Sequence, residues 1–247
     1  MELSLPVPRF VVDRLPAVGD SARLPRSEAA HARARRVKAG EAIVLVDGKG
    51  AEAAARVVRI SKDGVEVAVE RVRAPGAPES AISLLVAAVR VERLAWIAEK
   101  ATELGASRLV LLATGRTQSF RAAAAPSGRL ERVARAAAKQ SGAAAWPEII
   151  GPIAAPEALA AETAPTRLLL DASGTPFPAA LAPKPAAIAI GPEGGWSPEE
   201  LAAAKSVGWS IVRLPAGTLR AETAAVAALA LLRAARERGE LASGTSV

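Results

Sequence analysis

The chain has 247 residues, 51% of them hydrophobic, and carries a formal net charge of +7 at pH 7. This length allows one large domain or two smaller ones, and a basic surface favours polyanionic partners through contacts with phosphate. The sequence contains no Cys and only one His, which excludes disulfides, thiolate metal sites and multi-His zinc sites, so we predict no metal.

Residues 1–73 predict a small antiparallel barrel or sheet. Short apolar runs are separated by Asp-Gly turns, and Val65–Val72 alternates with period two. A short helix is expected at Ser27–Lys38, with Ser27 as its N-cap. The start of the chain lacks a basic segment followed by a long apolar one, and no uncharged apolar run of about 18 residues occurs. We therefore expect no signal peptide, no membrane span and a cytoplasmic location.

Residues 74–79, rich in Pro and Gly, predict a linker, and the pattern then changes. From 80 to 247, apolar strand-like runs alternate with amphipathic helices, which is typical of an α/β domain with a mainly parallel sheet. In chain order, the expected elements are Ile82–Val89, Val91–Leu104, Leu109–Ala113, Ser127–Gln140, Arg167–Leu170, Ala186–Ile190, Ser197–Ser206, Ile211–Leu214 and Ala221–Arg238, the last ending at Gly239.

Two loops that follow expected strands can form the walls of one ligand site. The run Ala186–Ile190 breaks into Gly-Pro-Glu-Gly-Gly at 191–195, where glycines let a ligand approach the backbone closely. A helix then starts with the capping-box pair Ser197 and Glu200. The second loop begins at Leu214 and leads into the last helix. Ligands bind where parallel strands end, so these loops predict a site for an adenine-bearing ligand, with a plain turn as the alternative.

Charged residues in three places predict functional contacts. Arg220 precedes the last helix, where the helix dipole disfavours a cation, so it is expected to contact RNA phosphate or a developing oxyanion. Glu222 and Thr223 could instead cap that helix. Basic side chains also cluster around a predicted N-terminal helix and along one face of a later helix that includes Lys139, which fits a phosphate backbone, a solvated face being the alternative. The candidate RNA-binding residues are His31, Arg33, Arg36, Arg129, Arg132 and Arg135.

These motifs together resemble the RsmE-type RNA methyltransferases, a branch of the SPOUT (trefoil-knotted) class. The similar segments are "HARARRVKAGEAIVLVDGKGAEAAARV" from His31, "EKATELGAS" from Glu99, "AKQSGAAAWPEI" from Ala138, "GPEGG" and "LRAETA". They cover most of the chain in the family's order. The chain departs from the usual pattern at Lys139, where the family has an acidic residue, after Gln140, where a basic residue is missing, and at Gly217-Thr218, where an Arg usually precedes "LR".

The resemblance implies a fold, a cofactor and a reaction. The fold would be an N-terminal PUA-like β-barrel joined to a C-terminal α/β SPOUT domain with a trefoil knot, forming a homodimer. The reaction would be S-adenosylmethionine-dependent methylation of N3 of a uridine in 16S rRNA of the small ribosomal subunit. The alternatives are methylation of another RNA, a non-catalytic RNA-binding protein and, third, a metabolic α/β enzyme that does not act on RNA. The implied cofactor-binding residues are Ile190, Gly191, Glu193, Gly194, Gly195, Leu214, Leu219 and Thr223.

For catalysis, Arg220 and Glu222 are the candidate residues. A neutral uracil imide is a poor nucleophile, so its N3 proton must be removed and the resulting charge stabilised. We expect Arg220 to stabilise that charge. Glu222 or Glu193 could take the proton, or both carboxylates could simply order their loops.

Overall fold

The computed structural model describes residues 7–75, 81–87, 90–115, 127–182 and 184–242. The chain divides into two compact units, one formed by 1–76 with 138–146 and the other by 77–137 with 147–247. Residues 76–79 of the predicted linker at 74–79 lie outside the described residues. The exact bounds of the linker, and those of the two predicted domains, stay predictions.

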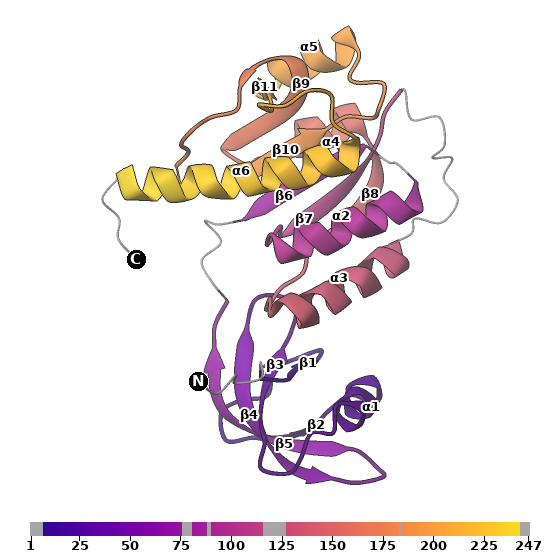
Figure 1. Cartoon of the computed structure of the whole chain (residues 1–247), viewed down its shortest axis with the longest axis vertical. Helices are drawn as coiled ribbons and strands as arrows, with labels where there is room; N and C mark the ends of the chain where they lie inside the picture. Colours follow the sequence, from indigo (N-terminus) through magenta and orange to yellow (C-terminus); the bar gives the residue numbers. More distant parts are fainter. Residues whose placement is uncertain (1–6, 76–80, 88–89, 116–126, 183, 243–247) are drawn as a thin grey trace. The chain divides into compact units, whose positions relative to one another are not determined.

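The N-terminal unit is built on a five-stranded sheet in the order β1-β3-β4-β5-β2 (Figure 1). Strands β3, β4 and β5 pair antiparallel as successive hairpins, which confirms the predicted pattern, whereas β1 joins β3 in parallel. Strand β2 is too short to produce a periodic signal and was not predicted. The elements are β1 (Arg9–Val11), β2 (Ser21–Arg23), α1 (Arg26–Ala34), β3 (Ala42–Val46), β4 (Glu52–Ile60) and β5 (Val65–Arg73).

The core of this unit follows from the period-two pattern of β5. Val65, Val67 and Val69 are buried and pack in one cluster with residues of α1 and the other strands. The predicted cap of α1 is wrong, because the N-cap is Pro25 and Ser27 lies inside the helix. The helix also ends earlier than expected, since Arg36 adopts a left-handed φ of 57°.

The C-terminal unit contains a six-stranded, wholly parallel sheet in the order β11-β9-β10-β6-β7-β8. This confirms the α/β fold with a parallel sheet. Among the described residues, we find no helix with the length and apolarity needed to cross a bilayer. The elements are β6 (Ile82–Ala87), α2 (Val91–Glu103), β7 (Arg108–Ala113), α3 (Ser127–Ser141, of which 138–141 belong to the N-terminal unit), β8 (Glu148–Ala154), α4 (Ala155–Ala161), β9 (Thr166–Pro176), β10 (Ala186–Ile190), α5 (Pro198–Ser206), β11 (Ser210–Arg213) and α6 (Ala221–Ala242).

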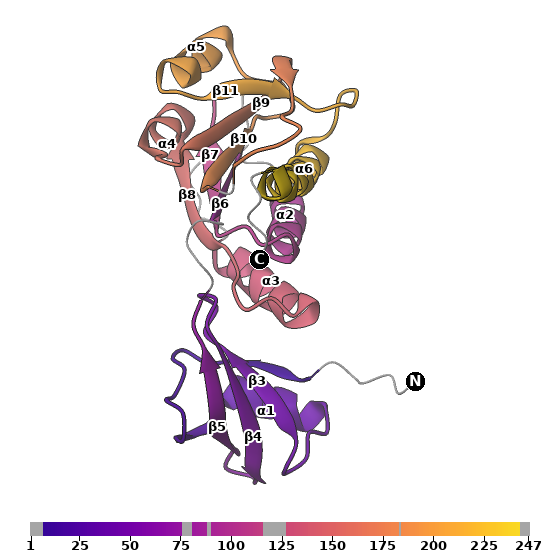
Figure 2. The same cartoon turned by 90° about the vertical axis from the view of Figure 1, so that its left-hand side faces the viewer.

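Helices cover both faces of the parallel sheet (Figure 2). Helices α2 and α6 share one hydrophobic cluster with the side chains on one face, including Leu84 and Leu229. Helices α4 and α5 share the second cluster with the opposite face, including Leu85 and Trp209. Because both faces are covered, every residue of β10 is buried, which explains its uninterrupted apolar sequence.

Three expectations about the C-terminal unit were incomplete or wrong. Helix α6 does not end at Gly239 but continues to Ala242, and the absent side chain of Gly239 instead allows a close approach to the Leu181 carbonyl. Strand β8 and helix α4 were missed, since Pro152 interrupts the strand pattern. Strand β9 extends well beyond the predicted Arg167–Leu170.

Candidate active site

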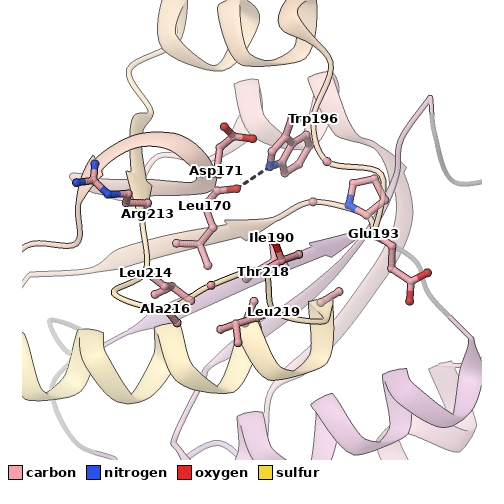
Figure 3. Close-up of a pocket in the computed structure, with 17 residues that line it drawn as sticks. Leu170, Asp171, Ile190, Glu193, Trp196, Arg213, Leu214, Ala216, Thr218 and Leu219 are labelled. Carbon is pink, nitrogen blue, oxygen red and sulfur yellow. Dashed lines mark hydrogen bonds between the residues drawn. The ribbon is translucent and has the colours of Figure 1, made fainter.

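A pocket of about 450 Å³ opens where β9, β10 and β11 end or leave the sheet (Figure 3). Its walls come from a bulge in β9, the loop that follows β10 and the loop between β11 and α6. Small-molecule sites commonly have volumes of about 300–1,000 Å³ and form at this edge of parallel sheets. The two predicted loops therefore meet around one pocket of a suitable size.

The third wall, in β9, was not predicted from the sequence. β9 pairs with β11 at Leu169 and Ile211, but the next pair is Thr175 with Val212. The residues between Leu169 and Thr175 consequently bulge out of the ladder, and Leu170, Asp171 and Ala172 line the pocket. Gly174 makes this possible, because a Cβ there would lie 2.6 Å from the Val212 amide nitrogen.

The glycine-rich loop is fixed to β9 by a buried tryptophan. Trp196 is 5% exposed, and its indole Nε1–H donates a hydrogen bond to the Leu170 carbonyl over 3.1 Å. Gly191 lies directly against this ring, since a Cβ at that position would be 2.8 Å from the indole nitrogen. The loop is thus held at both ends, and glycine is needed at position 191 because its backbone packs against the Trp196 ring.

The start of α5 confirms the predicted capping box. The Ser197 hydroxyl accepts a hydrogen bond from the Glu200 backbone N–H over 3.1 Å. The Glu200 carboxylate accepts one from the Ser197 N–H over 2.8 Å. This reciprocal pair satisfies free N–H groups of the first helical turn and ends the glycine-rich loop at a defined residue.

Most of the predicted cofactor-binding residues line the pocket, but two do not. Gly194 and Thr223 are exposed and absent from its lining. Thr223 lies on the outer side of the first turn of α6, whereas Ala221 and Ala224 face the pocket. The predicted residues that do line it are Ile190, Gly191, Glu193, Gly195, Leu214 and Leu219.

The interior of the pocket is largely apolar. In Figure 3, Leu170, Ile190, Leu214 and Leu219 gather around the cavity. The charged ends of Glu193 and Arg213 point away from it on opposite sides. A ligand with a flat apolar ring that reads backbone polar groups fits such a lining better than a polyanion does.

The predicted catalytic residues lie beside the pocket rather than in its lining. Arg220 is exposed at the last position before α6, and its carbonyl accepts a hydrogen bond from the Ala224 N–H over 2.9 Å. Glu222 is only 15% exposed, and its Oε1 lies 3.6 Å from Arg93 Nε. Its Oε2 is buried and has no hydrogen-bond partner among the described residues.

Arg93 was not predicted from the sequence. It lies in the first turn of α2 and contacts both Glu222 and Glu193, the acidic residue of the glycine-rich loop. The hydrogen bond to Glu193 and the charge of Glu222 raise the pKa of Arg93. Because Glu193 is 100 positions away along the chain, no local signal could have indicated this contact.

The basic face of α3 is only partly available to a ligand. Arg129, Arg132 and Arg135 are exposed, although Arg129 lies 3.7 Å from Glu92. Lys139 instead forms an ion pair with Glu28, which is buried in the N-terminal unit. The departure from the family pattern at Lys139 therefore has a structural explanation, because this lysine balances a buried carboxylate.

The basic residues near α1 have mixed surroundings. His31 is half-buried, and its ring meets Phe10 edge-on with 5.9 Å between the ring centroids. Arg33 is exposed but donates a hydrogen bond to the Ser61 carbonyl over 3.1 Å. Arg36 is exposed at the left-handed position after the helix. The arginines, more than His31, are accessible to a phosphate backbone.

Residues 77–233 match the RNA methyltransferase domain family, and residues 24–70 match the RNA methyltransferase PUA domain family. Among curated proteins, ribosomal RNA small subunit methyltransferase E from Mycobacterium bovis is 33% identical, over 89% of this chain and 88% of that protein. Its counterpart from Synechocystis sp. is 29% identical, over 83% of this chain and 70% of that protein.

Two solved structures extend the similarity to the fold. The ribosomal RNA small subunit methyltransferase E from Neisseria gonorrhoeae, bound to S-adenosyl methionine, superposes with a TM-score of 0.80 and 28% identity. That match covers 91% of this chain and 95% of the other. A methyltransferase from Legionella pneumophila in complex with S-adenosylmethionine gives a TM-score of 0.81 at 26% identity, covering 94% of this chain and 99% of the other.

Proposed function

We propose that this chain, which belongs to the ribosomal RNA small subunit methyltransferase E (RsmE) family, transfers a methyl group from S-adenosylmethionine to small-subunit rRNA. The observation that carries the proposal is the apolar pocket formed by the glycine-rich loop, the loop after β11 and the bulge in β9. The similar structures from Neisseria and Legionella contain that cofactor, which supports the same ligand here.

The residues of the pocket fit this cofactor. The side chains of Leu170, Ile190 and Leu219 offer an apolar surface for the adenine ring, and Gly191 leaves the backbone accessible. Asp171 adds a carboxylate at the wall, which suits a ligand with sulfonium and ammonium groups. When bound, S-adenosylmethionine supplies an activated methyl group, and the chain's task is to hold the target atom in line with it.

We propose N3 of a uridine in 16S rRNA as the target atom, with Arg220 stabilising the transition state. The N3 proton passes to water or to Glu193, and its loss spreads negative charge over the uracil carbonyl oxygens. The exposed Arg220 directly follows the pocket residue Leu219, so it can approach those oxygens. For Glu222, predicted as a catalytic residue, burial and the contact with Arg93 favour ordering of the start of α6 over proton removal.

The exposed arginines of both units are proposed to hold the RNA by its phosphates. Arg129, Arg132 and Arg135 follow one face of α3, and Arg33 and Arg36 are exposed at the end of α1. Such contacts position a nucleic acid without reading its sequence, and their contribution falls as salt rises. His31 stays a candidate in the same region, although part of its ring is covered by Phe10.

Three further features are proposed on the basis of family membership. The chain would form a homodimer, with the 40% exposed Trp96 of α2 as a candidate contact. The C-terminal unit would carry the trefoil knot of SPOUT proteins. The protein would act in the cytoplasm, where ribosomal subunits are assembled. Sedimentation velocity tests the dimer, and a Trp96→Ser variant tests the contact.

The deciding experiment incubates the purified protein with labelled S-adenosylmethionine and small ribosomal subunits, and then maps modified nucleosides by mass spectrometry. We expect one N3-methyluridine in 16S rRNA. Transfer elsewhere, or cofactor binding without transfer, would indicate a different RNA target. Loss of both binding and transfer would make a non-catalytic RNA-binding protein the better interpretation.

The same assay tests Arg220. Arg220→Ala should lower kcat by about 10²–10³-fold, the cost of removing one oxyanion donor, while leaving cofactor affinity nearly unchanged. Arg220→Lys, which keeps the charge, should retain part of the activity. If Arg220→Ala kept full turnover and unchanged RNA affinity, the proposed role would be wrong.

A further inference from the structure

Arg93 lies at the same edge of the sheet as the pocket. Strand β6 neighbours β10 in parallel, with Val86 paired to Ile190. The carboxyl ends of both strands therefore meet at one edge. The chain leaving β6 enters α2 at Val91, and the chain leaving β10 forms the glycine-rich loop. This register brings Arg93, in the first turn of α2, next to a loop that is distant in sequence.

The guanidinium of Arg93 joins two separate walls of the pocket. Its Nη1 donates a hydrogen bond to Glu193 Oε1, at the middle of the glycine-rich loop. Its Nε lies 3.6 Å from Glu222 Oε1, in the first turn of α6. The side chain of Arg93 is 29% exposed and that of Glu222 is 15% exposed, so water screens this pair less than a surface pair, whereas Glu193 is 62% exposed and its pair with Arg93 is screened more.

The glycine-rich loop is closed by a hydrogen bond from the Gly195 N–H to the Pro192 carbonyl over 2.8 Å, but this turn does not tie the loop to another element. Three of its five residues are glycines, and Gly195 adopts a left-handed φ of 70°. Glycine has more conformational freedom to lose than any other residue. Packing against Trp196 and the capping box at Ser197 hold the two ends of the loop. Between them, Glu193 is the charged side chain that ties the loop to another element.

We infer that Arg93 is a positioning residue of the cofactor pocket, which holds the glycine-rich loop and the first turn of α6 in the geometry that binds the cofactor. The inference rests on the proposed function, since it assigns the pocket to S-adenosylmethionine. Arg93 acts through Glu193 and Glu222 and is absent from the pocket lining. Its removal should mainly weaken cofactor binding, because a disordered loop must be ordered when the ligand binds.

The test measures the Kd for S-adenosylmethionine by calorimetry, together with KM and kcat on small ribosomal subunits. Arg93→Ala should raise the cofactor Kd and KM by about 10-fold, which corresponds to ~1.4 kcal/mol, with a smaller change in kcat. Arg93→Lys, which keeps the charge but not the two-sided geometry, should recover part of the affinity. Arg90→Ala is the matched control, because Arg90 is an exposed arginine at the N-cap of the same helix.

A double-mutant cycle separates positioning from a general loss of charge. If Arg93 acts through Glu193, the combined Arg93→Ala and Glu193→Ala variant should bind the cofactor little worse than either single variant. Additive effects, or an Arg93→Ala Kd equal to that of the Arg90→Ala control, would overturn the inference. Failure of the unsubstituted protein to bind the cofactor would instead refute the proposed function. Thermal unfolding of each variant identifies any that has lost its fold.

Discussion

Replacing Gly191 with alanine tests the packing that shapes the pocket. A Cβ at this position would lie 2.8 Å from the Trp196 indole nitrogen and 3.0 Å from its neighbouring ring carbon. Real Cβ atoms do not approach other atoms this closely, so the ring or the loop must move. The ring is 5% exposed and hydrogen-bonded to the Leu170 carbonyl, so it has little room to shift.

The cost can be worked out from these contacts. Overpacking a well-filled interior by one methyl group costs about 1–3 kcal/mol. Displacing the indole also breaks its hydrogen bond to Leu170, and an unsatisfied buried N–H adds about 1–3 kcal/mol. We expect Gly191→Ala to lower the free energy of unfolding by roughly 2–6 kcal/mol in total. Because Gly191 lines the pocket, the cofactor Kd should also rise by about 10-fold or more.

Thermal and urea unfolding measure the first effect, and calorimetric titration with S-adenosylmethionine measures the second. Gly217→Ala is the control for stability, since Gly217 also lines the pocket but has no atom within 4 Å of its added Cβ. Combining Gly191→Ala with Trp196→Phe should cost less stability than the sum of the two single changes, because the smaller ring makes room for the methyl group. Unchanged stability and affinity in Gly191→Ala would refute the reasoning.

Two further predictions concern ion pairs of the N-terminal unit. Burial raises the pKa of Glu52, but hydrogen bonds from Arg9 and Arg73 outweigh it and leave the pKa below its usual value. The ionised carboxylate therefore stabilises the fold above about pH 4.5, and this contribution is lost as pH falls through the lowered pKa. In urea unfolding, the Glu52→Gln variant should be less stable than the unsubstituted protein by about 1 kcal/mol at pH 7 but not at pH 2–3. An equal difference in stability at both pH values would contradict this. Lys139→Met leaves the 9% exposed carboxylate of Glu28 without its cation and should lower the free energy of unfolding by about 2–3 kcal/mol. Adding Glu28→Gln to this variant should restore most of the lost stability. An unchanged urea midpoint in the single variant would contradict this.

Local sequence patterns were sufficient to predict an element wherever its own residues determine its structure. Strand β10 was predicted at its observed bounds, Ala186–Ile190, because a strand covered on both faces must be apolar throughout. The start of α5 was also predicted correctly, since Ser197 and Glu200 satisfy each other's backbone groups within three residues. Burial along the whole strand determines β10, and contacts between residues close in sequence determine the start of α5.

The parts of the site that the sequence did not predict depend on contacts between segments distant in sequence. Gly174 permits the bulge in β9, but the bulge is a shift of register with β11 between Ile211 and Val212, and the sequence of β9 alone does not specify that pairing. Arg93 looks like an ordinary charged residue of an amphipathic helix until the sheet order places it beside Glu193. The two loops and the capping box at Ser197 could be predicted from glycine and helix-start signals, but the groups from distant segments that hold the loops could not.

The anchors of the pocket, meaning the contacts that hold its walls, are all made within the protein. Trp196 bonds to Leu170, Arg93 bonds to Glu193, and Gly174 lets the bulge in β9 lie against β11. A site whose walls are already fixed loses little conformational entropy when it is filled. Cofactor binding should therefore depend more on these supporting contacts than on new ones made by a moving loop. Substitutions at the anchors should then weaken cofactor binding even though Arg93 itself does not line the pocket.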